Sequence, residues 1–411
     1  MTAALEGVRV LDLGIITAGA ATSQVFADFG ADVIKVESTT YTDPFRNWSQ
    51  ISAAGSQDLN QSPPFWSVNR NKRGVAIDLK TPQGRDLFLA LAAEADIVVE
   101  NFRRGVLERL GIGFDTLKTI NPTIILLSLS SQGTSGPDKN YISFGSPLEA
   151  LGGGMAITGY AAGDPTWTSN NVNFPDQLVS ILAPGMALAA IHDRARTREA
   201  VHIDLAQREA VTSVVGETLL QASSSGEIAE PKGNRHDWFA PQGVYPAAGE
   251  DQWVAISVRS DEQWSSVVEI LELAPDLTAI PAASRRERHD DLDLVLAERT
   301  ASFDKRVLAT ALQKAGVAAA AVLTSAEVLD HEQLTALGFA QEAPGDPIIQ
   351  RGFVVRMSET PAAVVRRAPR LGEHTAEVLQ QVLHRSDDEL AGLETSGVVF
   401  TDGPQSVGAK D

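Results

Sequence analysis

The sequence has no cysteine among its 411 residues. Disulfides, thiolate nucleophiles and cysteine-ligated metals are therefore excluded. The seven histidines are scattered, and no two of them have H-x-x-x-H or similar ligand spacing. We therefore expect no metal site.

Long apolar runs are also missing. A membrane-spanning helix needs about 20 apolar residues. The longest uncharged candidate covers only residues 178–191, and it contains Pro184 and Gly185. The first residues, MTAALEGVRV, lack the basic region and apolar core of a signal peptide. We expect a cytoplasmic protein that does not bind a membrane.

Basic residues are scarce, with 34 Lys and Arg against 53 Asp and Glu, which gives a net charge of −19. Such an acidic surface is a poor non-specific partner for nucleic acid. Any anionic ligand would need a local basic pocket. Apolar residues make up 43% of the chain, as expected of a folded globular protein. A length of 411 residues is sufficient for two or three domains.

Two common catalytic signatures are absent. After Leu13 the chain reads GIITAGAA, not the G-x-G-x-x-G of a dinucleotide site, although Glu37 ends a second apparent strand. No G-x-S-x-G is present, so serine hydrolase chemistry is poorly supported. The GGG at 152–154 lacks a P-loop lysine and is typical of a turn.

Strand and helix patterns alternate through the first 130 residues. Thr81 and Pro82 form a helix cap with proline at the first helical position. We expect strands at 8–13, 32–37, 74–79, 96–100 and 124–129, and helices at 22–29, 82–94 and 104–110. This alternation predicts an α/β fold, with a Rossmann-like, mostly parallel sheet covered on both faces.

The pattern changes near residue 223. Residues 185–220 read as helical with a break near 196–199, and a Ser-rich linker follows. A hairpin (244–246 with 253–258) and helices from Asp261, at 290–299 and at 306–314 indicate a smaller α+β domain. We therefore divide the chain into a large domain (1–222), a linker and small domain (223–330) and a C-terminal segment (331–411), with 403–411 as a frayed tail.

One carboxylate is isolated. Asp176 is the only formally charged residue between Asp164 and Asp193. It suits a helix N-cap, where a negative charge is favoured by about 0.3–1 kcal/mol. The alternative is a reactive carboxylate kept where water is scarce. Position alone leaves both interpretations open.

Basic residues cluster locally. The stretch 66–89 carries five basic and two acidic residues, and a second group holds Arg103, Arg104 and Arg109. Solvated helix faces would explain both groups. A pocket for a ligand with several phosphates would explain them too, because both lie where strands end and helices begin.

Long stretches of the chain resemble one known family. They include LEGVRVLDLG, GADVIKVES, NRNKRGVAIDLKTPQGR, ADIVVENFRRGVLERLGIGFDTLKTINP, SSQGTSGP, FPDQLVSILAPGMALAAIHDR and APRLGEHTAEVL. These stretches resemble the class III coenzyme A transferases, the family of formyl-CoA and carnitine CoA transferases, over nearly the whole chain and in the family's order.

The resemblance implies an obligate homodimer of two interlocked rings. The Rossmann-like part and the C-terminal segment would together form the large domain, which holds the CoA site and the catalytic acid. CoA and acyl-CoA would act as substrates alongside an organic acid, with no permanently bound cofactor. The catalytic acid would be Asp176, reacting through a mixed anhydride and an aspartyl-CoA thioester.

The resemblance also implies the CoA contacts. Lys80, Arg103 and Arg109 would meet phosphates, Phe102 would flank the adenine, and the backbone of 77–80 would read the adenine edge. The full expected set is Thr17, Ala18, Ile77, Asp78, Leu79, Lys80, Asn101, Phe102, Arg103, Arg109 and Lys139.

Some positions depart from the family pattern. Thr17, Ala20 and Ser38 stand where formyl-CoA transferase has Gln, Pro and Arg, and PKGNRHDW replaces its glycine run. Formate and oxalate are therefore not expected as substrates. His236, Trp238 and Phe239 are compatible with a larger acyl group or with simple aromatic packing.

Two alternatives remain. The first is an α-methylacyl-CoA racemase, although Pro137 stands where those enzymes carry an acid–base His. The second is an inactive CoA-binding protein. The sequence identifies neither the CoA donor nor the acceptor acid.

Overall fold

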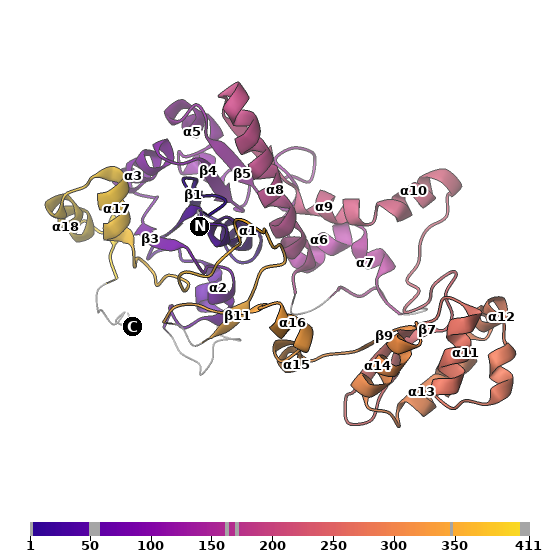
Figure 1. Cartoon of the computed structure of the whole chain (residues 1–411). Coiled ribbons are helices and arrows are strands. Elements are labelled where there is room, and N and C mark those ends of the chain that lie inside the picture. Colours follow the sequence, from indigo (N-terminus) through magenta and orange to yellow (C-terminus); the bar gives the residue numbers. More distant parts are fainter. Residues whose placement is uncertain (1–2, 49–57, 161–163, 169–171, 346–347, 403–411) are drawn as a thin grey trace, which may run out of the picture. The chain divides into compact units, whose positions relative to one another are not determined.

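The computed structural model describes residues 3–48, 58–160, 164–168, 172–345 and 348–402 (Figure 1). The chain forms two compact units. One contains residues 1–155, 167–225 and 338–411, and the other contains 156–166 and 226–337. The domain bounds expected at residues 222 and 330 remain a prediction. They assigned residues 156–166 to the large domain, whereas these residues belong to the second compact unit. The expected tail 403–411 lies outside the described residues.

A seven-stranded sheet forms the centre of the first unit within the described residues. Its order is β12-β3-β2-β1-β4-β5-β6. All neighbouring strands are parallel except β12, which runs antiparallel to β3. The strands are β1 Arg9–Asp12, β2 Asp32–Glu37, β3 Arg73–Ile77, β4 Ile97–Glu100, β5 Ile125–Ser128, β6 Val201–Asp204 and β12 Val399–Phe400. The predicted α/β class with a mostly parallel sheet is confirmed.

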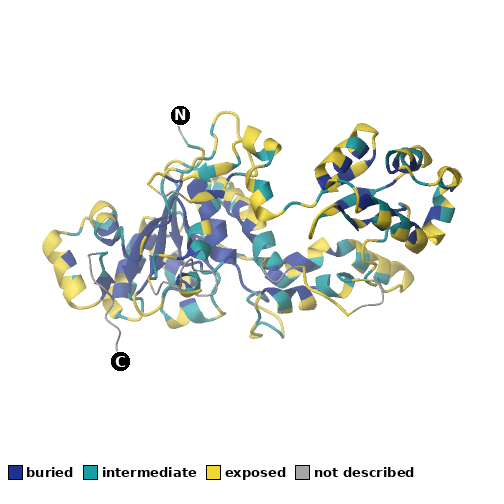
Figure 2. Ribbon diagram, turned by 90° about the horizontal axis from the view of Figure 1, so that it is seen from below, coloured by how far each residue is buried: buried dark blue, intermediate teal, exposed yellow. Residues whose placement is uncertain are grey.

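The sheet is buried on both faces (Figure 2). Leu11, Ile34, Val75 and Val98 point to one core, which also contains Phe88 and Leu91. Val10, Val33, Ile97 and Val99 point to the other. Side chains alternate across a strand, so continuous apolar runs such as IVVE are required where both faces are covered.

Helices cover these two faces (Figure 1). Thr81 caps α3 as predicted, since its hydroxyl accepts from the amide of Gly84. The helices of this unit are α1 Ala18–Asp28, η1 Pro44–Asn47, α2 Pro63–Ser67, α3 Pro82–Ala93, α4 Val106–Arg109, α5 Phe114–Ile120, α6 Gly145–Leu151, α8 Phe174–Thr197, α9 Gln207–Val214, α10 Gly216–Ser225, α17 Thr375–Leu383 and α18 Asp387–Thr395. A small hairpin joins β10 Ala340–Glu342 and β11 Ile349–Arg351, and α7 Gly154–Ile157 crosses the boundary between the units.

Helix α8 is the one described helix long and apolar enough to cross a membrane by length and composition. It is also a core helix, because Val179, Ala183 and Ala187 are buried against the sheet cluster. The expectation of continuous helix after residue 200 is wrong, because Val201–Asp204 pairs with β5 as an edge strand.

The second unit has its own core. Its antiparallel sheet has the order β7-β8-β9, and the predicted hairpin is confirmed by the pairing of β7 with β8. Trp264, Leu292 and Leu308 are buried beneath it. The elements are β7 Gln242–Pro246, β8 Trp253–Ser257, α11 Asp261–Ile270, η3 Pro275–Ala279, α12 Ala282–Glu287, α13 His289–Thr300, α14 Lys305–Lys314, β9 Ala318–Ala321, α15 Ser325–Leu329 and α16 Glu332–Ala336.

Candidate active site

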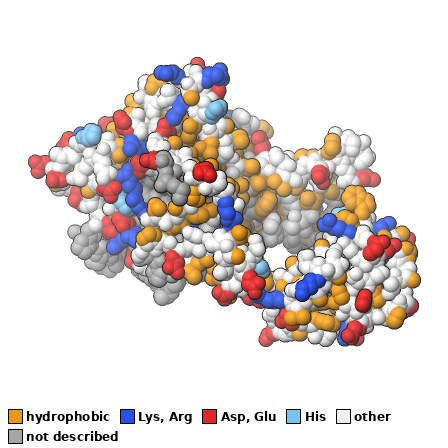
Figure 3. All heavy atoms as spheres, viewed as in Figure 1, with side chains coloured by type: hydrophobic (Ala, Val, Ile, Leu, Met, Phe, Trp, Pro, Cys, Tyr) orange, Lys and Arg blue, Asp and Glu red, His pale blue; other side chains and the backbone are white. Residues whose placement is uncertain are grey.

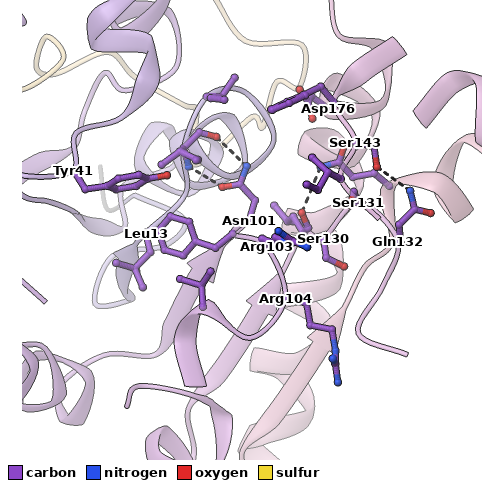
Figure 4. Close-up of a pocket in the computed structure, with 18 of the residues that line it drawn as sticks. Leu13, Tyr41, Asn101, Arg103, Arg104, Ser130, Ser131, Gln132, Ser143 and Asp176 are labelled. Carbon is purple, nitrogen blue, oxygen red and sulfur yellow. Dashed lines mark hydrogen bonds between the residues drawn. The ribbon is translucent and has the colours of Figure 1, made fainter. Parts of the chain in front are cut away.

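A cavity of about 580 Å³ opens at the carboxyl ends of the parallel strands (Figure 4). Leu13 follows β1, Asn101 follows β4 and Leu129 follows β5, and all three line it. The strand order reverses between β1 and β4. Open α/β sheets bind ligands at such a switch point. The sheet topology therefore places a binding site here.

The loop after β1 forms one wall, and side chains fix its backbone. The side-chain oxygen of Asn101 accepts from the amide of Ile15 at 2.8 Å, and its nitrogen donates to the Ile15 carbonyl at 3.0 Å. Asp43 accepts from the amide of Ile16 at 3.0 Å. Ile16 has a φ of 57°, which is rare for a β-branched residue. The surrounding bonds hold this strained backbone in place.

Asp176 faces the same cavity (Figure 4). It lies in the first turn of α8, whose N-cap is Asn173. The interpretation of Asp176 as the cap itself is therefore wrong. Protein atoms surround the carboxyl group, although the residue keeps a partly exposed face toward the cavity. Burial raises the pKa of Asp176 to about 6, against the lowering effect of hydrogen bonding by Asn173 and Gln207.

Four cations line the cavity, together with the carboxylates of Glu37, Asp78 and Asp176. Lys80, Arg103, Arg104 and Lys139 all contribute to its wall. Arg103 and Arg104 donate to the carbonyls of Asn140 and Thr134, and the Arg104 side chain extends away from Asp176 (Figure 4). Among the residues that the structure describes, none of the four forms an ion pair. Unpaired cations at a cavity wall suit an anionic ligand.

Most of the basic cluster at 66–89 serves a different purpose. Arg70 pairs with Asp28 at 2.7 Å, Lys72 with Asp12 at 2.8 Å, and Arg73 with Asp32 at 2.7 Å. These side chains are buried, and none lines the cavity. Treating the whole cluster as ligand-binding is therefore wrong, because a sequence window does not reveal partners on distant strands.

The expected site residues fall into two groups. Ile77, Asp78, Leu79, Lys80, Asn101, Phe102, Arg103, Lys139 and Asp176 line the cavity. Thr17 and Ala18 are instead buried at the start of α1, and Arg109 is exposed at the end of α4. No described group of three or more His, Asp or Glu residues could hold a metal ion.

Several neutral residues of the cavity wall were not predicted from the sequence. Ser130, Ser131, Gln132 and Ser143 line the cavity, and Gln132 donates to Ser143 at 2.9 Å (Figure 4). Asn173 and Gln207 lie on the Asp176 side. Neutral amides and hydroxyls are common everywhere in a sequence, so only the fold could bring them to notice.

Glu100 ends β4, next to the lining residues Asn101 and Phe102, and was also missed. It accepts from the amide of Phe102 at 2.8 Å. Burial raises the pKa of Glu100 to about 7. The side chain that accepts a hydrogen bond from the Phe102 backbone therefore has a pKa near neutral pH.

Comparison with known proteins agrees with this geometry. The profile of CoA-transferase family III matches residues 5–375. The chain belongs to this family. As a family III CoA-transferase it is an enzyme that acts on CoA thioesters and carboxylates. The predicted family and enzyme class are confirmed.

Curated relatives of this CoA-transferase cover almost all of it. Succinyl-CoA–D-citramalate CoA-transferase of Chloroflexus aurantiacus is 33% identical, over 96% of this chain and 98% of its own. Succinyl-CoA:mesaconate CoA-transferase of Haloarcula hispanica is 34% identical, over 92% and 96%. A solved CAIB/BAIF family protein from Brucella suis is 29% identical with a TM-score of 0.84, covering 93% of this chain and all of its own.

Proposed function

We propose that this enzyme transfers CoA from an acyl-CoA thioester to a carboxylic acid through covalent intermediates on Asp176. One observation carries the proposal: a single cavity is lined by the Asp176 carboxylate, whose pKa is set by burial and by two neutral amides, and by four cations that form no ion pair among the described residues. The cations would bind the phosphates of CoA, and the carboxylate would meet the thioester. Phe102, Arg103, Lys80 and Lys139 would make the CoA contacts.

The reaction would begin with attack by Asp176 on the thioester carbonyl. A C–O bond forms to the acyl carbon, the C–S bond breaks, and CoA leaves as a thiolate. The thiolate then attacks the aspartyl carbonyl, forming an aspartyl-CoA thioester and releasing the first acid as a carboxylate. An incoming carboxylate repeats these two steps in reverse and regenerates Asp176.

The site would activate a weak nucleophile by its surroundings. Carboxylates react slowly in water, so a positioned carboxylate with little hydration is required. A pKa of about 6 leaves Asp176 mostly ionised at neutral pH. The same burial that raises this pKa removes part of the hydration that would slow attack.

The relatives' names suggest the substrates. They combine succinyl-CoA with D-citramalate or mesaconate, and a further relative is a succinate–glutarate CoA-transferase from Agrobacterium fabrum that is 30% identical. We therefore propose succinyl-CoA as the donor and a short dicarboxylic acid as the acceptor.

We also propose that the enzyme is an interlocked homodimer. Exposed apolar side chains lie along α8 (Figure 3), including Ile181, Leu182 and Met186. Helix α10 has no buried residue, although Leu219 and Leu220 lie on it. Several large apolar side chains exposed on one helix are typical of protein interfaces. A second copy of the chain would cover it.

The mechanism is tested by trapping. Incubation with succinyl-CoA should attach CoA to Asp176, and intact-mass and peptide analysis should find the thioester. Hydroxylamine should cleave the thioester, leaving an aspartyl hydroxamate. Asp176→Ala should bind CoA yet lack both the adduct and transfer. Transfer retained by Asp176→Ala would overturn the mechanism.

A second experiment, together with the trapping assay, separates the alternatives. A racemase would exchange the α-proton of a 2-methylacyl-CoA in deuterated water without any acceptor acid. An inactive CoA-binding protein would bind CoA but form no adduct. We expect adduct formation and no exchange.

A further inference from the structure

Gln207 has an unusual position beside Asp176. It is the first residue of α9, 5% exposed, and it lines the same cavity. Its backbone amide donates to the Ser130 carbonyl at 2.9 Å, which fixes the residue to the end of β5. Its side chain does not cap α9. The side-chain nitrogen and oxygen of Gln207 are therefore available for contacts other than helix capping.

The two ends of this side chain have different surroundings. The nitrogen donates to the Leu129 carbonyl through a long bond of 3.4 Å, and the amide also interacts with the Asp176 carboxylate. The side-chain oxygen is buried and has no hydrogen-bond partner among the described residues. A buried acceptor without a donor destabilises the folded protein. A functional role at the cavity is one physical reason for keeping such a group.

Building on the proposed function, we infer that Gln207 is a two-sided positioning residue. Its Nε2 holds the Asp176 carboxylate in place for attack, and its Oε1 accepts an N–H or O–H group of the bound substrate. Two sources fit this donor. One is the pantetheine amide next to the CoA sulfur, and the other is a hydroxyl group on the acceptor acid.

The amide would also act after the first step. When the thiolate attacks the aspartyl carbonyl, the C=O electrons move onto the Asp176 oxygen. The Nε2 hydrogen that held the carboxylate then faces this developing negative charge. Hydrogen-bond donors aimed at such an oxygen lower the barrier to acyl transfer. Asn173, at the N-cap of α8, would contribute from the other side.

Gln207→Leu tests the first half of the proposal. Leucine keeps similar bulk and removes both polar atoms, so the variant should fold with an unreduced Tm. We expect kcat/KM to fall about 10- to 100-fold. The acidic limb of the pH–rate profile, near pH 6 in the wild type, should move to higher pH because a donor that favours the ionised Asp176 is lost. No charged side chain is among the causes of the raised pKa of Asp176. The pKa of Glu100, about 7, should be the same in the variant and in the wild type.

Gln24→Leu is the matched control. Gln24 is 2% exposed, its side-chain oxygen also lacks a described partner, and it lies outside the cavity lining. We expect wild-type kinetics and an unmoved acidic limb. If Gln207→Leu keeps the wild-type limb and kcat/KM, the positioning role is refuted.

The second half is tested by binding and by acceptor choice. In an Asp176→Asn background, Gln207→Leu should weaken CoA binding about 3- to 10-fold by calorimetry if the pantetheine amide is the donor. If a hydroxyl group of the acceptor acid supplies the donor, CoA affinity stays constant. The wild type should then prefer citramalate to 2-methylsuccinate, which lacks the hydroxyl group, and Gln207→Leu with Asp176 intact should lose this preference. If neither quantity changes, the Oε1 role is overturned.

These outcomes are separate from the proposed mechanism. Transfer by Asp176→Ala would refute the aspartyl intermediate whatever Gln207 does. An inactive Asp176→Ala together with an unaffected Gln207→Leu would refute only the inference about Gln207.

Discussion

At the residue scale, the catalytic role proposed for Asp176 conflicts with the stability of the fold. Its folded pKa of about 6 exceeds its ordinary value of 3.8 because burial disfavours the charged form. Folding therefore binds a proton more tightly at this site. The ionised carboxylate lowers the free energy of unfolding at the pH where the enzyme would work. If Asp176 is the proposed nucleophile, stability is given up for a reactive group, as is common at active sites.

Asp176→Asn should therefore stabilise the protein above pH 6. The gain should be about 1–3 kcal/mol at pH 8, discounted for the face open to solvent. It should shrink as the pH falls through 6 and vanish below the ordinary pKa of 3.8, where both states are protonated. Thermal unfolding at several pH values measures it, with a Tm rise of about 2 °C or more at pH 8.

Asp164→Asn is the control for this measurement. It removes the same charge from an exposed position in the second unit. We expect little change of Tm at any pH. An Asp176→Asn variant that is no more stable than the wild type at pH 8 would contradict the buried-charge argument.

Residue identity alone predicted only part of the site. Asp176 was conspicuous because no other formal charge lies near it in the sequence. Gln207 and Asn173 were not, since neutral amides carry no such contrast. The basic residues 70, 72 and 73 were misleading, because their acidic partners come from β1, β2 and α1. Pairing across a sheet is a property of the fold, which local charge counting cannot reproduce.

At the element scale, the loop between β1 and α1 shows how strands position a ligand wall. Asn101 was expected to contact CoA, and it lines the cavity. Its side-chain amide is nevertheless used twice on the backbone of Ile15. It therefore ties the end of β4 to the end of β1 at the point where the strand order reverses. The shape of the wall depends on this bond pair.

Asn101→Ala should release the loop. Two hydrogen bonds are lost, and Ile16 can leave its strained conformation, so CoA affinity should fall about 10-fold or more and stability by about 1–3 kcal/mol. Calorimetry with CoA and urea unfolding measure the two quantities.

Asn121→Ala is the matched control for the loop. The Asn121 amide similarly donates to the carbonyls of Ala92 and Ala95, far from the cavity lining. It should lose comparable stability but keep its CoA affinity. Equal losses of affinity in both variants would show that general destabilisation, and not the loop, controls binding.

Element prediction succeeded where burial is complete and failed at the sheet edge. The strands predicted at 32–37 and 96–100 are almost fully buried on both faces, and β2 and β4 lie there. By contrast β6 has the sequence VHID, with His202 and Asp204 on its exposed face. This edge strand has only one partly buried face, and its four-residue alternating pattern is too short to be separated from the helical patterns on either side.

At the scale of the whole molecule, the acidic surface and the basic cavity wall are complementary in function. A net charge of −19 repels polyanions in general, whereas the four unpaired cations line one cavity. Selectivity for CoA over other phosphorylated molecules would then depend on shape and on the acyl end. Long-range charge would not attract the ligand, so its binding should rely on contacts made after entry.

The proposed homodimer is tested by mass and by surface substitution. Light scattering should give about twice the chain mass of 43.8 kDa. Ile181 is 69% exposed on α8 and Leu220 is 70% exposed on α10. Replacing both by Glu should bury two charges at the interface, which is strongly unfavourable, and should lower the Tm and release monomer on dilution.

Leu294→Glu is the control for this pair. It alters a similarly exposed leucine on α13, 73% exposed, and should leave the mass unchanged. A wild-type mass of 43.8 kDa at micromolar concentration would refute the dimer, and the apolar face of α8 would then require a different partner.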